Sequence, residues 1–311
     1  PVGYTINPST GRARLTDIGA VLTNKVGLIT FAHTISASVF TGAMLMLGIA
    51  MWHVIRRPKR DTQAFRSAAK IGAWTALAAV AVVFFTGDTQ GKIMTDTQPM
   101  KIAAAEALYE TAQPAPFSIL TIGTLNGKKP IFTIDVPDLL SFLATGHFDG
   151  KVQGINNLEA QYQQTYGPGT YTPNIPVTYW GFRGMIGFGG LGGLVALLAL
   201  WTMRRGRTPT SKWVMRAALL GPFLPLLGNS AGWIFTEMGR QPWIVFGDMR
   251  TSAGVSPSVS MGEVITSLCV FALLYGALAV IEFGLLVKYA KQGLPETATE
   301  TGDEQPLAFA Y

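Results

Sequence analysis

The sequence predicts an all-α integral membrane protein with five transmembrane helices. Of its 311 residues, 49% are hydrophobic and 14% are charged, whereas a typical soluble domain has about 25% charged residues. The mean hydropathy is +0.31. Five stretches reach the length of about 20 mostly apolar residues that crosses a bilayer. They cover residues 26–55, 68–86, 179–203, 213–235 and 264–287.

A polar segment, residues 87–178, separates the second and third spans. It is too polar to cross a membrane and too long for a tight turn, so we expect a small extramembrane lobe. The chain then divides into four parts. These are 1–86 with an outer N-terminal segment and two spans, the lobe 87–178, three spans within 179–290, and a tail, 291–311.

The positions of Lys and Arg predict the orientation of the spans. RRPKRDTQAFR follows the first span, RRGRTPTSKWVMR follows the third, and Lys288 and Lys291 follow the fifth. Because short cytoplasmic loops carry an excess of these residues, we expect these segments and the C-terminus in the cytoplasm. The lobe 87–178 then faces outward, and Trp180 and Trp243 are expected in the outer aromatic belt.

Several classes of protein and site are excluded by missing sequence patterns. Cys269 is the only cysteine, so the chain has no intrachain disulfide, no c-type haem attachment and no thiolate zinc site. Neither a Walker A motif nor a pattern typical of nucleic-acid binding occurs. The sequence opens with PVGYTINPSTGRARL, without Met or a signal peptide. We therefore expect it to begin inside a longer chain.

His33 and Met185 are candidate ligands of a haem iron. Ionisable groups inside a bilayer are costly and indicate function, and His33 lies within the first span. If the helices alternate in direction, Met185 lies at nearly the same depth, and a His/Met pair is a known haem ligation. The alternatives are a histidine hydrogen-bonded to a neighbouring helix and a methionine that fills the core.

Three charged residues and a tryptophan mark the outer ends of the third and fourth spans. Arg183 could pair with a haem propionate, stabilise a semiquinone anion, or extend its side chain to the interface. Glu237 could lie on a proton path, pair with Arg240 or give an oxygen ligand to iron. Trp233 lies one turn before Glu237 on the same helix face, where it could stack on a macrocycle or pack in the core.

The start of the polar lobe, GDTQGKIMTDTQPMKIAAAEALYET, contains Asp88, Lys101 and Glu106. Strong helix formers surround Lys101 and Glu106, so we expect both on a short helix. A cation and a carboxylate near the outer surface suit a quinol headgroup, because one donates a hydrogen bond and the other accepts a proton. The alternative is an ordinary surface pair. Glu282, midway along the fifth span, could move protons or pair with another subunit.

Four segments in order resemble subunit I of the cytochrome bd-type quinol oxidases. The most specific reads GWIFTEMGRQPWIVFGDMRT, and the others read FAHTISASVFTGAML, QPMKIAAAEALYET and WGFRGM. The resemblance implies an electrogenic quinol:oxygen oxidoreductase of a bacterial cell (inner) membrane. Such an enzyme oxidises ubiquinol or menaquinol at the outer face and reduces oxygen to water. Family members have nine helices in this subunit, and the five spans here are similar to the C-terminal five.

The resemblance also implies roles for individual residues. His33 and Met185 are similar to the axial ligands of haem b558, with Arg183 beside them. Glu237 is similar to the ligand of haem b595, with Trp233 near it. The quinol site would include Lys101, Glu106 and Asp88. Arg240 would lie near haem propionates.

Further cofactors and partners follow from the resemblance alone. The third haem, haem d or a further haem b, would take its histidine ligand from a helix outside this sequence. The expected partners are subunit II, a small single-helix subunit, lipid, quinol and oxygen. Two alternatives remain: a haem-free transporter or scaffold, and a diverged quinol-oxidising cytochrome b that reduces no oxygen.

Overall fold

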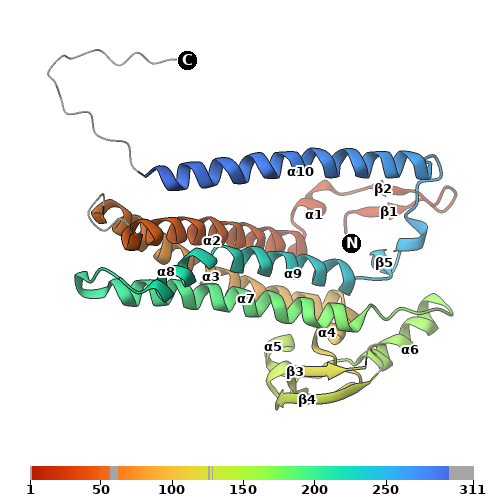
Figure 1. Cartoon of the computed structure of the whole chain (residues 1–311). Coiled ribbons are helices and arrows are strands. Elements are labelled where there is room, and N and C mark those ends of the chain that lie inside the picture. The colour runs from red at the N-terminus through yellow and green to blue at the C-terminus, as the bar shows by residue number, and fades with distance from the viewer. Residues whose placement is uncertain (1, 57–61, 125–126, 128, 294–311) are drawn as a thin grey trace. The chain divides into compact units, whose positions relative to one another are not determined.

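The computed structural model describes residues 2–56, 62–124, 127 and 129–293. It is mostly helical, and five helical segments are long and apolar enough to cross a membrane, as predicted (Figure 1). Their bounds are α2 (Lys25–Arg56), α3 (Thr62–Thr97), α7 (Ile175–Met203), α8 (Lys212–Leu220) with α9 (Phe223–Gly239), and α10 (Met261–Gln292). Helix α10 belongs to a compact unit of its own, and the elements before it form another.

Two spans differ in detail from the sequence expectation. Helix α3 continues well beyond residue 86, to Thr97, so Asp88 lies on a helix and not in a loop. The fourth span is interrupted between Leu220 and Phe223. Pro222 lies at the break, and a proline has no N–H to donate to the preceding turn. One predicted span is therefore built from two helices, α8 and α9.

The first unit contains a bundle of four spans, with α8 and α9 forming one span, and each span packs mainly on two others. Helix α2 packs on α3 and α8, α3 also packs on α7, and α7 also packs on α9. Helices α2 and α7 therefore stand at opposite corners of the bundle. Side chains from these two helices can approach a common centre from opposite sides.

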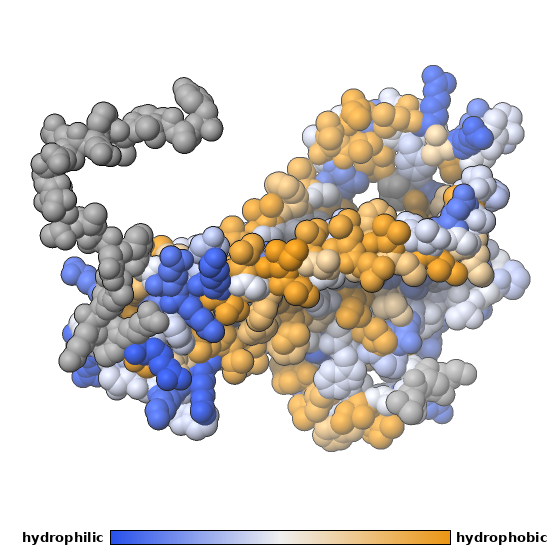
Figure 2. Space-filling view, turned by 45° about the horizontal axis from the view of Figure 1, so that its top comes forward, coloured by the Kyte–Doolittle hydropathy of each residue, from blue (hydrophilic) through white to orange (hydrophobic). Residues whose placement is uncertain are grey.

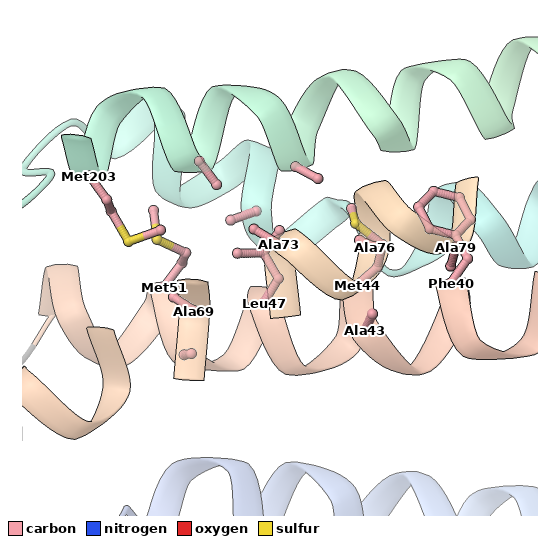
Figure 3. Packing of buried hydrophobic residues seen from close by; sticks show 14 residues of the cluster. Phe40, Ala43, Met44, Leu47, Met51, Ala69, Ala73, Ala76, Ala79 and Met203 are labelled. Carbon is pink, nitrogen blue, oxygen red and sulfur yellow. The ribbon is translucent and has the colours of Figure 1, made fainter. Parts of the chain in front are cut away.

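Small residues of α3 let this helix lie close to α2 (Figure 3). Ala69, Ala73 and Ala76 are fully buried, and they pack with Leu47 and Met51 of α2. A β-carbon added to Gly72 would lie 3.0 Å from Ala43 O. Small residues at such spacings are typical of helix contacts within membranes.

The lobe between α3 and α7 contains short helices and a hairpin. Helix α4 (Pro99–Glu106) confirms the short helix expected around Lys101 and Glu106. The hairpin strands are β3 (Phe117–Gly123) and β4 (Pro130–Val136), and α5 (Leu139–Thr145) and α6 (Ile155–Tyr166) follow. Smaller elements elsewhere are β1 (Tyr4–Ile6), β2 (Ala13–Leu15), α1 (Ile18–Leu22), η1 (Arg204–Gly206), β5 (Trp243–Val245), β6 (Met249–Arg250) and η2 (Thr251–Ala253).

Trp243 does not lie in an exposed aromatic belt, so that expectation was wrong. It is buried and stacks on Tyr171 with ring centroids 5.7 Å apart, and Tyr166 meets its edge at 5.0 Å. The Arg250 guanidinium lies 5.8 Å from its ring centroid. Packing against these rings buries the large apolar surface of the indole, which is favourable. Trp180, by contrast, is 52% exposed.

Candidate functional site

His33 lies on α2 and faces the end of the apolar part of α3. Its Nδ1 lies 3.0 Å from Thr86 Oγ1. The Thr86 hydroxyl donates its only hydrogen to the backbone, with Val82 O at 2.7 Å. The hydroxyl therefore accepts from His33, which assigns the ring proton to Nδ1 and leaves a lone pair on Nε2. Gly87 makes room for the ring, since an added β-carbon would lie 3.3 Å from His33 Cε1.

Met185 lies on α7 and packs against α9. A β-carbon added to Gly232 would lie 2.8 Å from Met185 Sδ, so this glycine admits the side chain. A contact between α2 and α7 shows the height of Met185 relative to His33. Phe40 of α2 reaches Gly192 of α7, whose added β-carbon would lie 2.7 Å from Phe40 Cζ.

Phe40 and Gly192 each lie seven residues, or about two helical turns, from the candidate ligands. Both ligands lie toward the same end of the bundle, because each precedes this contact in the sequence and α2 and α7 run in the same direction, with α3 returning between them (Figure 1). His33 and Met185 therefore stand at similar heights on opposite corners. Their side chains have separate protein partners, Thr86 and Gly232.

Arg183, two residues before Met185, joins α7 to the lobe. Its Nη2 lies 2.5 Å from Glu106 Oε2, and both side chains are buried. The same nitrogen donates to the Ser118 carbonyl at the start of β3. Arg183 Nε is buried and has no hydrogen-bond partner among the described residues. One N–H of this arginine is thus left to meet an acceptor beside Met185.

Burial raises the pKa of the Glu106 carboxyl to about 7, although the charge and hydrogen bonds of Arg183 act in the opposite direction. Taking a carboxylate out of water disfavours its charged form. Glu106 lies on α4, outside the spanning helices. A carboxyl group whose pKa is near neutrality can both accept and release a proton.

Lys101 lies on another face of α4 and contacts α9. Its stem crosses Gly239, where an added β-carbon would lie 2.9 Å from Lys101 Cγ. Its ammonium lies 5.0 Å from the Phe235 ring centroid. Burial and the charge of Arg240 lower the pKa of Lys101 to about 8, against the pull of Glu237.

Glu237 and Arg240 form an ion pair at the end of α9, with Arg240 Nη2 2.5 Å from Glu237 Oε2. Of the three roles considered for Glu237, the structure shows the ion pair. Beside the pair is a cavity of about 100 Å³. Its wall includes Gln98 Oε1, Arg240 Nε and Trp243 Nε1, which are buried without a hydrogen-bond partner among the described residues.

Two of the expected site residues, Trp233 and Asp88, lie outside the contacts described above. Trp233 is 70% exposed, so it does not pack in the core of this chain. Asp88 pairs with Lys92 of the next turn at 2.7 Å, and it is grouped with neither Lys101 nor Glu106.

The structure therefore divides these candidate residues into two groups, which the sequence alone did not distinguish. Glu106 joins Arg183 near Met185, and Lys101 joins Glu237 and Arg240. Helix α4 carries one member of each group and connects them. Sequence reasoning missed Thr86, whose signal was its place at the polar end of a span.

Comparisons with known proteins agree with this architecture. A family model described as cytochrome bd terminal oxidase subunit I matches residues 1–294. The cytochrome bd ubiquinol oxidase subunit 1 of Bacillus subtilis is 38% identical over 94% of this chain and 62% of its own length. The cytochrome bd-II ubiquinol oxidase subunit 1 of Escherichia coli is 28% identical over 98% of this chain and 70% of its own length.

A putative menaquinol oxidase subunit I of Bacillus subtilis is 29% identical over 95% of this chain and 64% of its own length. A solved structure of the bd oxidase from Geobacillus thermodenitrificans is 27% identical, with a TM-score of 0.80. It covers 94% of this chain and 64% of the solved chain. The chain thus spans 62% of the length of the first of these relatives. Since the family model matches nearly the whole sequence, the chain belongs to the family of cytochrome bd terminal oxidase subunit I.

Proposed function

We propose that this chain forms part of subunit I of a bd-type quinol:oxygen oxidoreductase in a bacterial cell membrane. Such an enzyme would oxidise quinol at the outer face and pass electrons through haems to oxygen. Membership of the family supports the proposal. The observation that carries it at the residue level is the Thr86–His33 hydrogen bond, which leaves His33 Nε2 available to iron.

His33 and Met185 are proposed to hold haem b558. The donor set fits this group, because a neutral imidazole and a thioether are a known axial pair. A metal-binding histidine usually donates its second N–H to a neighbouring acceptor, as His33 does to Thr86. The unpaired N–H of Arg183 would meet a propionate oxygen. Bound there, the haem would supply one-electron transfer.

Glu237 is proposed to hold haem b595, with Arg240 beside it and Trp233 against the macrocycle. Arg240 Nε and Trp243 Nε1 are buried donors without partners on the wall of the neighbouring cavity. Buried donors need acceptors, and a carboxylate is a strong one. This donor set fits a haem propionate. Arg240 would hold both the propionate and the Glu237 carboxylate.

Glu106, Lys101 and Asp88 are proposed to serve quinol oxidation at the outer surface. Glu106 would accept a quinol proton, since its pKa lies near 7. Lys101 would donate a hydrogen bond to a quinol oxygen as an ammonium ion. The two side chains contact different helices, α7 and α9, so each would act on a different part of the substrate or at a different step. The relatives carry ubiquinol and menaquinol in their names, and the proposal covers either.

The assembly and orientation are also proposals. Subunit II and a small single-helix subunit would pack on the exposed apolar faces of the spans. The lobe around α4 would face outward, and the Arg-rich loops and the C-terminus would face the cytoplasm, according to the distribution of positive charge. Haem d, or a further haem b, would take its histidine ligand from outside this sequence.

A reduced-minus-oxidised visible spectrum of the assembled enzyme tests the proposal. We expect a low-spin b-type band in the parent, and loss of that band or conversion to high spin in His33→Ala and Met185→Leu. A folded parent without haem bands would return the haem-free transporter or scaffold to consideration. Unchanged low-spin bands in both variants would show that other residues bind the iron.

A further inference from the structure

The β3–β4 hairpin of the outer lobe presents an apolar face. In its antiparallel register Leu120 lies opposite Ile134 and Ile122 lies opposite Phe132. Side chains that face each other across two strands share one side of the sheet. Ile122, Phe132 and Ile134 are 47%, 51% and 45% exposed. We call these four residues the hairpin face, and none of them is polar.

The other side of the hairpin is attached to the protein. Thr121 and Ser118 are buried there. The Tyr179 hydroxyl accepts from Thr121 N at 2.6 Å and lies 3.0 Å from Ser118 Oγ. The hairpin face is thus the side away from these β3 contacts, and the residues of β4 are exposed on both sides. In Figure 2 hydrophobic residues gather below the spans, on the side where Figure 1 draws β3 and β4.

Contacts along α7 fix the height of the hairpin. Ser118 is bonded to Arg183, Thr121 to Tyr179, and Gly127 lies against Pro176. Strand β3 therefore follows the first two turns of α7, where the exposed Trp180 marks the membrane interface. At the base of the lobe, Phe142 lies 5.7 Å from the ammonium of Lys92 on α3 and stacks on the exposed Phe148.

We propose that the hairpin face rests on the outer leaflet of the bilayer, at the boundary between headgroups and acyl chains. The hairpin face lies at the same height as the outer ends of the spans, whose exposed apolar side chains face the same lipid. The hairpin has two strands in the part of the chain that the structure describes. Tyr179 and Arg183 meet part of the outer edge of β3, whereas the outer edge of β4 keeps N–H and C=O groups that no neighbouring strand pairs. Such edges cannot enter the hydrocarbon core, which limits the hairpin to the interface, where headgroups and water satisfy them.

Spin labels on the assembled protein test this inference, which does not depend on the proposed haem and quinol roles. In a Cys269→Ser background, Ile122→Cys, Phe132→Cys and Ile134→Cys place a label on the hairpin face. Asp135→Cys is the matched control, because it is exposed on the same strand but on the other side of the sheet. Lys151→Cys gives a second exposed reference in the lobe.

Collisions with oxygen, which concentrates in lipid, are compared with collisions with a water-soluble nickel chelate. The protein is held in nanodiscs of phosphatidylethanolamine and phosphatidylglycerol, and circular dichroism and size-exclusion chromatography confirm that each variant is folded. We expect an oxygen-to-nickel ratio several-fold higher on the hairpin face than at residues 135 and 151. Equal ratios would place the face in water, and low collision rates with both reagents would show that another subunit covers it. Either result would overturn the proposal.

Discussion

At His33, one hydroxyl group determines which imidazole nitrogen carries the proton. Thr86 donates to its own helix backbone and can only accept from the ring. The sequence predicted His33 as a ligand because a histidine within an apolar span is costly. It could not predict Thr86, since the pairing joins residues 53 positions apart on two helices. Such pairing depends on helix rotation, which local sequence patterns leave undefined.

Replacing Thr86 with Val should raise the midpoint potential of the low-spin haem. Without an acceptor at Nδ1–H the imidazole is a poorer electron donor, so the oxidised iron loses stabilisation. A neutral hydrogen bond of about 0.5–1.5 kcal/mol corresponds to a shift of roughly 20–60 mV. A spectroscopic redox titration measures it. Thr89→Val is the control, because Thr89 makes the same backbone hydrogen bond, at 3.0 Å to Phe85 O, on the same helix.

Quinol oxidation should depend on pH through Glu106 and Lys101. Glu106 accepts a proton only as a carboxylate, so the rate should rise as pH rises through about 7. Lys101 donates as an ammonium ion, so the rate should fall as pH rises through about 8. A profile of kcat/KM against pH should therefore peak between these values. Glu106→Gln should remove the acidic limb and lower the rate, whereas the exposed Glu110→Gln should retain both limbs.

At the scale of single elements, the spans were far more predictable than the lobe. Long apolar runs define a transmembrane helix by composition alone, and all five were found. The hairpin strands are seven residues each, and their Ile, Phe and Thr residues do favour strands. They were hidden within a segment that is polar on average. Their attachment to α7 through Tyr179 and Arg183 joins residues about sixty positions apart, which no local pattern indicates.

Tyr179→Phe should loosen the hairpin from α7. The change removes the acceptor of the buried Thr121 N–H and the partner of Ser118 Oγ. An unsatisfied buried donor costs about 1–3 kcal/mol, so hydrogen exchange of the β3 amides should accelerate by roughly tenfold or more. Tyr275→Phe, at an exposed position of α10, should leave this exchange unchanged. Unchanged β3 protection in Tyr179→Phe would mean that Arg183 alone holds the strand.

At the scale of the whole bundle, stability should depend on how closely the helix backbones approach. Membrane helices gain little from burying apolar surface, because lipid is equally apolar, so close packing at small residues matters more. Gly48 of α2 meets the break between α8 and α9. A β-carbon there would lie 2.7 Å from Ala218 O and 3.1 Å from Pro222 Cγ. Backbone atoms cannot give way as a flexible side chain can, so the helices would have to separate.

Gly48→Val should therefore destabilise the bundle by about 1–3 kcal/mol, the usual cost of overpacking. Gly42→Val is the matched control, because Gly42 lies on the same helix and a β-carbon there would meet nothing within 4 Å. Thermal unfolding of the detergent-solubilised protein, followed by loss of the monodisperse peak, should separate the two variants clearly. Both carry the same β-branched residue in the same helix, so helix propensity cancels between them. If they unfold at the same temperature, the contact between α2 and the α8–α9 break does not limit the stability of the bundle.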